Sequence, residues 1–444
     1  MLDELKTYLG SQESNDMHPS EIVAILKELD EDDFEEAIQL VPKEFIGDVA
    51  LALPDRYFGD IIESLEIEDL TEAVSELESD DRVDFMQELQ EHDEDVASEL
   101  FDTLDKEDQV EITRLQKYEE DQAGSYMQTE LFTAYEGEIV EDVVKEFAKL
   151  KKSNELENVH NLFITRQDNR LHYSIALEDL LIFDFKKSMQ ENIEENEENF
   201  EPIIALDTDD IKEVVRLFEE YDLSVMPIVN QHNILLGRIT SDDIYDIISE
   251  QATEQMYHLA GVDDEAEEDE EILKAGKKRA SWLGLNLLTA ILASLVISLF
   301  ADTLESIVAL AILMPIVASM GGNAGTQTLT VVVRQLALGD ISQNDATRII
   351  KKELGISLLN GILFAIIMGI IASLWFDNGI LLGVVIALSM LINLLMAGFF
   401  GATIPLVLKK MDIDPAIGST VILTTVTDIV GFFSFLGLAT IILL

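Results

Sequence analysis

Five long apolar stretches fill the C-terminal part of the chain and constrain its fold more than any other feature. They run over residues 282–300, 306–333, 354–376, 379–408 and 417–444. Each approaches or exceeds the roughly 20 residues with which a helix crosses a bilayer core. The sequence therefore predicts a mostly α-helical membrane protein with five transmembrane helices.

Basic residues occupy alternate connections between these stretches and predict the orientation of the chain. Because Lys and Arg are retained on the cytoplasmic side, we expect a cytoplasmic N-terminus, an extracytoplasmic C-terminus and a multi-pass location in the plasma (inner) membrane. No basic segment followed by an apolar core opens the chain, so no cleaved signal peptide is expected. The basic residues are Lys274, Lys277, Lys278 and Arg279, then Arg334, Arg348, Lys351 and Lys352, and finally Lys409 and Lys410.

The distribution of charge also divides the chain near residue 280, where the apolar stretches begin. The sequence has 87 acidic and 29 basic residues, a net charge of −58, but only nine of the acids and six of the bases lie in residues 281–444. Nucleic-acid binding through an ordinary basic footprint is excluded because phosphates would be repelled, and cations are the favoured partners. Adaptation to a salty cytoplasm is an alternative source of the acidity. The absence of cysteine excludes disulfides and thiolate metal sites.

An apolar residue recurs every twelve positions in the acidic part. The segments between these positions begin with acidic residues or proline and continue with an apolar face of about two helical turns. This pattern predicts stacked short helices, an acidic α-helical superhelical domain over residues 1–126. The repeated positions are Leu29, Val41, Leu53, Leu65, Leu77 and Leu89.

Residues 139–181 and 211–248 share one order of elements: a helix, an apolar strand opened in the second copy by Pro227, a polar turn, a strand and an acid-led helix. The repeat resembles a tandem α/β pair of CBS domains, which we place at residues 127–249. Thr240 and Asp243 have the T-x-x-D spacing with which CBS modules hold a nucleotide ribose, whereas Ala176 replaces the threonine in the first copy. Two interpretations of the pair stay open: it binds a nucleotide such as ATP, or it has a purely structural role.

A helix-capable acidic connector over residues 250–280 leads to the first apolar stretch. It contains the run DDEAEEDEE at 263–271. Acidic runs are usually solvated linkers, but this one joins the α/β pair directly to residues 281–444, the expected transmembrane domain. We therefore expect it to have a mechanical role.

Asp428 is the one ionisable side chain deep inside an apolar stretch. It lies about 17 Å from the cytoplasmic end of the fifth stretch, at 1.5 Å per residue. Thr420 and Thr424 precede it at four-residue steps and so share its helix face. A charge at the bilayer centre costs about 2.5 to 3.5 kcal/mol unless it faces protein or water. A functional site is therefore favoured over a simple bond to a neighbouring helix.

The second stretch carries the sequence MPIVASMGGNAGTQT at 314–328. Pro315 and the Gly321-Gly322 pair loosen a helix, which a membrane tolerates only where protein or a wet cavity satisfies the freed backbone groups. Asn323 is about 15 Å from the cytoplasmic end of the second stretch, level with Asp428. The polar run of the second stretch and Asp428 can therefore lie next to each other. Packing against a neighbouring helix is the alternative. The neutral oxygen ligands offered here are Asn323, Thr326, Gln327 and Thr330.

Such a site favours a hard cation, because the stretches contain no Cys or His and no deep Lys or Arg. One carboxylate per chain is sparse for calcium but suits magnesium, which keeps its waters and is held by one or two carboxylates. If two chains pair about a two-fold axis, two copies of Asp428 can face one central pathway.

The segments MPIVASMGGNAGTQTLTVVVRQLALGDI (314–341) and TTVTDIVGFF (424–433) resemble the span-two and span-five signatures of the MgtE magnesium channels. HPSEIVAILKEL (18–29) and KYEEDQAGSYMQTE (117–130) extend the resemblance over almost the whole chain, with residues 250–280 as the family's plug helix. It implies a homodimeric channel in membrane lipid, with Asp428 as the pore carboxylate that binds hydrated magnesium and the polar residues of the second stretch supporting it.

The resemblance also implies that cytoplasmic acids bind magnesium when it is abundant and close the pore. Gln251 and Gln255 depart from the family's pattern, at positions that are often acidic. Carried over by position, the regulatory candidates are Asp243, Asp246 and Glu254, with Asp242 and Glu250 nearby.

Two alternatives to magnesium transport are a carrier for another divalent ion, such as Mn²⁺ or Co²⁺, and a membrane-anchored sensor whose CBS pair binds adenine nucleotide. An enzyme is not expected, because the sequence shows neither a nucleophile-base pair nor a histidine-containing metal motif.

Overall fold

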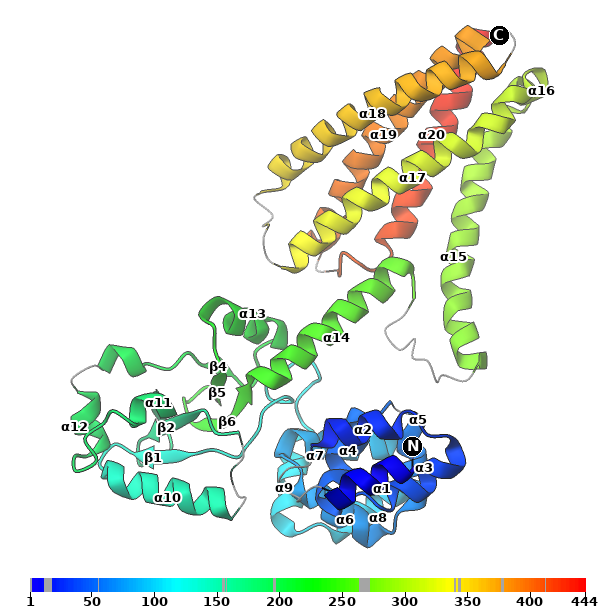
Figure 1. The fold of residues 1–444 in the computed structure, drawn as a ribbon. Coiled ribbons are helices and arrows are strands. Elements are labelled where there is room, and N and C mark those ends of the chain that lie inside the picture. Colours follow the sequence, from blue (N-terminus) through cyan, green and yellow to red (C-terminus); the bar gives the residue numbers. More distant parts are fainter. Residues whose placement is uncertain are drawn as a thin grey trace. The chain divides into compact units, whose positions relative to one another are not determined.

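A computed structural model describes residues 2–11, 18–54, 56–153, 156, 158–194, 197–262, 272–338, 341, 345–376, 379–411 and 413–444 of the chain. They form two compact units, Met1–Ser249 and Glu250–Leu444 (Figure 1). The acidic run at 263–271, for which we expect a mechanical role, lies outside the described residues.

Short helices stack in the N-terminal part of the first unit, as the sequence predicts. They are α1 (Leu2–Ser11), α2 (Pro19–Leu26), α3 (Glu31–Ile38), α4 (Lys43–Ala52), α5 (Arg56–Ser64), α6 (Ile67–Glu76), α7 (Ser79–His92), α8 (Glu94–Thr103) and α9 (Lys106–Leu115). The side chains of Asp30, Asp93 and Asp105 accept hydrogen bonds from first-turn N–H groups and so begin α3, α8 and α9. Alternate helices lie against one another, α2 on α4, α4 on α6 and α6 on α8.

The twelve-residue repeat marks the ends of these helices. Leu29, Val41, Leu53, Leu65 and Leu77 lie one to three residues beyond the end of a helix. Leu89 lies three residues before the end of α7, because α7 has 14 residues where α4 and α6 have 10.

Two α/β repeats complete the first unit and confirm the predicted order of elements. The first contains β1 (Thr133–Tyr135), α10 (Val140–Lys152), β2 (Asn161–Thr165), β3 (Leu171–Ala176), α11 (Leu177–Leu180), α12 (Met189–Ile193) and a 3₁₀ turn (Glu197–Phe200). The second contains β4 (Ala205–Leu206), α13 (Ile211–Tyr221), β5 (Val225–Val229), β6 (Leu235–Thr240) and α14 (Ser241–Ala260). In each sheet the middle strand pairs parallel with the first strand and antiparallel with the last. The first strands, β1 and β4, were not predicted.

Equivalent asparagines turn the chain between the paired strands of both repeats. Asn169 and Asn233 both have φ 60°, a left-handed conformation that asparagine tolerates better than most residues. The two turns also bond to each other, since the Leu171 N–H donates to Asn233 and the Leu235 N–H donates to Asn169. The sequence repeat is therefore matched by a direct contact between the copies.

Pro227 lies in the middle of β5 and does not open it, so that expectation is wrong. It is paired with Arg238, whose own N–H and C=O bond to Gln128 on the opposite side of β6. In an antiparallel ladder, the nitrogen of Pro227 then points away from β6. On that side β4 pairs only with Ile228 and Val229, so the missing N–H of proline breaks no ladder bond.

The described residues of the connector belong to two helices that extend beyond it. Helix α14 begins at Ser241, directly after β6, and continues to Ala260, whereas residues from Ile272 onward belong to the first long helix of the second unit. The T-x-x-D segment therefore lies at the start of the helix that carries Glu254.

Five helices of the second unit are long and apolar enough to cross a membrane, as predicted. They are α15 (Ile272–Ser298), α17 (Val308–Ala337), α18 (Ala346–Trp375), α19 (Gly379–Lys410) and α20 (Ser419–Leu443). Helices α17 to α20 pack as a bundle, and α15 contacts α20 (Figure 1). The helices extend beyond the apolar stretches to include basic residues such as Arg334, Lys352 and Lys409. A short helix that was not predicted, α16 (Ala301–Ser306), lies between α15 and α17.

Candidate functional site

The glycines of α17 admit a side chain from α19. The Asn393 amide is fully buried, and its Nδ2 donates to the Val317 carbonyl at 2.8 Å. A β-carbon at Gly321 would collide with this amide, and one at Gly431 of α20 would lie 2.8 Å from its Nδ2. Asn393 therefore joins three helices at one level, a role for which the sequence analysis did not select it.

A close contact between α17 and α20 lies nearer the C-terminal end of α17 and the N-terminal end of α20. A β-carbon at Gly325 would be 3.0 Å from the side chain of Leu423. Asn323 lies between Gly321 and Gly325 on α17, and Asp428 lies between Leu423 and Gly431 on α20. The two contacts therefore bracket Asn323 and Asp428 at the same level of the bundle.

The polar residues of α17 form a stripe on the surface of the single chain. Their spacing of three, four and seven residues places them on one helix face. Asn323, Thr326, Gln327 and Thr330 are all exposed. On α20, Thr424 is exposed, and Asp428 and Thr420 are half-buried. Both predicted sets thus remain accessible in the single chain.

Asp428 is not the only carboxylate within the long helices. Glu353 of α18 is buried, and its Oε2 accepts a hydrogen bond of 3.1 Å from the Thr328 hydroxyl of α17. Glu353 directly precedes the third apolar stretch, which begins at Leu354. Helix α18 begins earlier, at Ala346, and therefore contains Glu353 near its N-terminal end.

The end of α14 contacts the beginning of α20. The Thr420 hydroxyl donates to the Leu259 carbonyl at 2.9 Å. The Leu259 side chain packs against a cluster that includes Leu329 and Leu423. Thr420 shares a helix face with Thr424 and Asp428, so α14 ends beside one end of that face.

The regulatory candidates all lie on α14. Asp242, Asp246 and Glu250 are exposed, and together with the half-buried Glu254 they recur at four-residue steps. Asp243 is one residue from this row. Repulsion from Asp242 and Asp246 contributes to raising the pKa of Asp243, although its burial is the larger cause.

Asp243 faces a group of acids that the sequence analysis missed, at the first turn of α7. Burial, then repulsion from Asp81 and Asp243, raises the pKa of Asp80 well above its usual range. Burial, then Asp84 and Asp243, raises the pKa of Asp81 to about 7. Burial also raises the pKa of Glu78 to about 7, although the Arg238 guanidinium opposes the shift. We call Glu78, Asp80, Asp81 and Asp243 the acidic cluster.

Among the described residues, the acidic cluster does not receive a hydrogen bond at every carboxylate oxygen. Asp80 is 7% exposed, and its Oδ1 has no hydrogen-bond partner among the residues that the structure describes. Asp243 is better satisfied, since its Oδ2 accepts from the Thr240 hydroxyl at 2.7 Å and from the Thr240 N–H at 3.2 Å. Thr240 is fully buried. Binding of a nucleotide by Thr240 and Asp243 stays a prediction. A buried, mutually repelling set of oxygens is suited to a hard cation.

Comparison with known proteins identifies the family. The chain is 30% identical to the magnesium transporter MgtE of Thermus thermophilus over 78% of this chain and 75% of the relative. It is 32% identical to the magnesium transporter MgtE of Bacillus subtilis over 74% of this chain and 71% of the relative. The chain belongs to the MgtE family.

Three sequence profiles match parts of this MgtE-family chain, and every candidate residue except Glu254 lies within one of them. The family described as a divalent cation transporter matches residues 314–438, the MgtE intracellular N domain matches 17–121 and the CBS domain matches 199–250. Five apolar helices together with these matches make the chain a multi-pass membrane protein. The resemblances to MgtE and, in the second repeat, to a CBS domain are confirmed.

A similar solved structure matches part of the chain. It is the cytosolic domain of the Mg²⁺ channel MgtE in complex with ATP, which is 26% identical and covers 56% of this chain and 100% of that chain, with a TM-score of 0.49.

Proposed function

We propose that the protein is a channel that imports hydrated Mg²⁺ across the plasma membrane. The observation that carries this proposal is the position of Asp428, level with Asn323 between the Gly325–Leu423 contact and the Asn393 amide that Gly321 and Gly431 admit. One carboxylate surrounded by amide and hydroxyl oxygens suits a dication that keeps most of its water. Membership of a family described as divalent cation transporters supports the same conclusion.

The pathway lies between two copies of the chain. The support for this proposal is the polar stripe of α17, which is exposed in the single chain within a helix otherwise suited to lipid. Polar groups facing hydrocarbon are costly, so a second copy or a water-filled space has to cover the stripe. A two-fold axis along it would place two Asp428 carboxylates on one pathway.

The membrane potential drives import. With the acidic unit in the cytoplasm, as the alternating basic connections indicate, a potential of 100 mV contributes about 4.6 kcal/mol to the entry of each doubly charged ion. No nucleotide hydrolysis is needed for this step.

Cytoplasmic Mg²⁺ closes the channel. The acidic cluster would hold the ion where α7 meets the second α/β repeat, through Asp80, Asp81 and Asp243. The uncompensated Oδ1 of Asp80 and the raised pKa values of its neighbours support a cation there. Asp242, Asp246 and Glu250 continue the acidic surface along α14, whose end reaches the beginning of α20. An ion that binds one arrangement of these groups better than another shifts the population toward that arrangement.

Uptake measurements on Asp428→Asn test the proposal. Removing the only charge on this face should abolish Mg²⁺ entry into liposomes under an imposed negative potential. Asp302→Asn, an exposed acid on α16, is the matched control and should conduct like the wild type. Uptake that survives in Asp428→Asn would refute conduction through this site and favour a membrane-anchored sensor. Faster entry of Mn²⁺ or Co²⁺ than of Mg²⁺ would favour another divalent cargo.

A further inference from the structure

Arg238 is the largest side chain that is fully buried among the described residues, with 1% of its surface exposed. It lies on β6, which leads into the first turn of α14 and so to Asp243. Charged side chains are almost never fully buried unless they are paired. The groups that surround this guanidinium therefore indicate its role.

The guanidinium of Arg238 contacts three separate segments of the first unit. Its Nε donates to the side-chain carbonyl of Gln128 at 3.2 Å, and its Nη1 donates to the backbone carbonyl of Asn158 at 3.3 Å. Its Nη2 lies 3.6 Å from Oε1 of Glu78, the residue that precedes α7. Two neutral oxygens thus hold the group in place, and Glu78 supplies the opposite charge.

Glu78 depends on this guanidinium for compensation of its charge. Its Oε1 is buried and has no hydrogen-bond partner among the residues that the structure describes. Burial is the main cause of the raised pKa of Glu78, and the charge of Arg238 is the strongest influence that lowers it. Arg238 therefore stabilises a carboxylate oxygen that no described donor reaches.

Gln128 connects Arg238 to the opposite side of the acidic cluster. Its Oε1 accepts from Arg238, which leaves its Nε2 to donate to Asp243 Oδ2 at 3.4 Å. The backbones of Gln128 and Arg238 also exchange two hydrogen bonds of 2.8 Å, which fix one residue against the other. The guanidinium thus acts on Glu78 directly and on Asp243 through Gln128.

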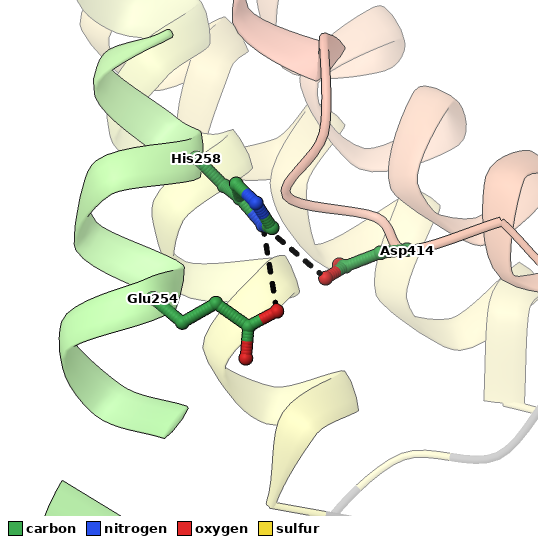
Figure 2. Close-up of side chains that lie close together, drawn as sticks. All are labelled: Glu254, His258 and Asp414. Atoms are coloured by element: carbon green, nitrogen blue, oxygen red, sulfur yellow. Dashed lines mark ion pairs between the residues drawn. The ribbon is translucent and has the colours of Figure 1, made fainter. Parts of the chain in front are cut away.

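A second polar cluster, near the end of α14, contains a different base. Figure 2 shows the side chains of Glu254 and Asp414 directed at the ring of His258, whose Nδ1 lies 3.6 Å from Asp414 Oδ2 and 4.0 Å from Glu254 Oε1. Imidazole is charged only when it is protonated, whereas guanidinium is always charged in proteins. The compensation that Arg238 provides is therefore permanent.

This permanent charge changes the charge balance of the acidic cluster. The cluster has four carboxylates, of which one Mg²⁺ balances two and Arg238 balances one. We propose that Arg238 is an internal cation of the acidic cluster, which holds the start of α7 against the second α/β repeat before Mg²⁺ binds. This inference rests on the proposed binding of Mg²⁺ by the cluster. Arg238 is a positioning residue, because it contacts the carboxylates and not the ion.

Differential scanning calorimetry of the full-length protein in detergent at pH 8 tests this role, in chelator and in millimolar Mg²⁺. Arg238→Met keeps a long apolar side chain but removes the charge. We expect it to lower the melting temperature of the unit Met1–Ser249 by about 5 °C or more in chelator, because a buried carboxylate loses its counter-charge. Mg²⁺ should restore most of this loss, because the ion replaces the missing charge.

Ile239→Val is the matched structural control. Ile239 is the next residue of β6 and is fully buried, and its substitution changes no charge. The loss of melting temperature in this variant should therefore be the same in chelator and in Mg²⁺. Equal losses under the two conditions in Arg238→Met would overturn the proposal, because Arg238 would then act only through packing.

A double variant keeps the proposal testable if Arg238→Met does not fold. Combining Arg238→Met with Glu78→Gln removes both charges of the pair, so no buried charge is left without its partner. We expect the double variant to be more stable in chelator than Arg238→Met alone. A double variant that is no more stable than Arg238→Met would refute compensation of Glu78 by Arg238.

The wild-type protein separates this inference from the proposed sensing of Mg²⁺. If Mg²⁺ stabilises the wild type and Arg238→Met equally, the internal cation is refuted and the sensing stands. If Mg²⁺ stabilises Arg238→Met but leaves the wild type unchanged, the internal cation is supported and the sensing by this cluster fails.

Discussion

Asn393 shows how much of the membrane unit depends on single polar side chains. Its amide bonds to the Val317 carbonyl where Gly321 and Gly431 leave room for it. Hydrogen bonds of this kind between helices satisfy backbone groups that lipid cannot. Asn393 therefore positions α17 and α20 around the level of Asp428 without belonging to the polar stripe.

We predict that Asn393→Ala destabilises the membrane unit by about 1 to 3 kcal/mol, because the Val317 carbonyl loses a buried donor. Thermal unfolding in detergent measures the effect. Ser434→Ala is the control, since its hydroxyl donates to the Gly431 carbonyl within the same helix. Equal melting temperatures for the two variants would contradict the assigned role.

The acidic cluster predicts a pH dependence whose direction follows from its raised pKa values. A carboxyl whose pKa is higher in the folded state stabilises that state below its unfolded pKa, and the contribution disappears as the pH rises through the folded value. For Glu78 the change from 4.5 to about 7 corresponds to roughly 3 kcal/mol, at about 1.4 kcal/mol per pKa unit.

In the presence of chelator, we expect the unit Met1–Ser249 to lose stability between about pH 4 and pH 7. Mg²⁺ should restore stability at pH 8 and have little effect at pH 4. Asp80→Asn should flatten the dependence, because it removes the most buried charge of the cluster, whereas the exposed Glu94→Gln should preserve it. Thermal unfolding over a pH series measures all three, and a stability that rises with pH in chelator would refute the assignment.

Asp428 and Asn323 could be selected from the sequence because a charge and a Gly-rich polar run are conspicuous in an apolar background. It could not predict Asp80 and Asp81, since nothing local distinguishes a buried acid from the many exposed ones in residues 1–280. Asn393 carries no charge and stands alone among apolar residues. Its importance depends on glycines that lie far from it in the sequence.

Elements were predictable where they are long and periodic. The five apolar helices and the two α/β repeats have clear patterns, and the structure contains them. Strands β1 and β4 have three and two residues, too few for alternation to be detected. The basic ends of α17 and α18 were assigned to connections because hydropathy falls there while the helical hydrogen bonding continues.

The contact between α14 and α20 can be tested at the level of the element. Thr420→Ala removes the hydrogen bond to the Leu259 carbonyl, worth about 1 kcal/mol or roughly a fivefold change in an equilibrium. We therefore expect more residual Mg²⁺ flux at high internal Mg²⁺. Thr425→Ala is the matched control, because its hydroxyl donates to the Val421 carbonyl of its own helix. Tighter closure in Thr420→Ala would contradict a role for this contact in the closed state.

At the scale of the whole molecule, the boundary between the two compact units lies earlier in the chain than the change in charge near residue 280. The acidic unit ends at Ser249 and the apolar unit begins at Glu250, inside the single helix α14. Composition alone placed the change from acidic to apolar sequence near residue 280. It could not detect that the last part of α14 packs with the apolar helices.

We predict that a chain lacking residues 1–249 still conducts Mg²⁺ but no longer responds to internal Mg²⁺. The polar stripe, Asp428 and the five long helices remain, whereas the acidic cluster is lost. Uptake by liposomes loaded with graded Mg²⁺ compares this chain with the full-length protein. Flux that still falls as internal Mg²⁺ rises would place the sensor in the remaining unit.

The close contacts at Gly321, Gly325 and Gly431 limit how the channel can change during evolution. At each position the side chain is already a hydrogen atom, so every replacement adds volume. The added atoms would meet Leu423 of α20 at Gly325, and the Asn393 amide of α19 at Gly321 and Gly431. Substitution at the glycines can therefore only move these helices apart, and a closer approach would require a smaller residue at Asn393 or Leu423.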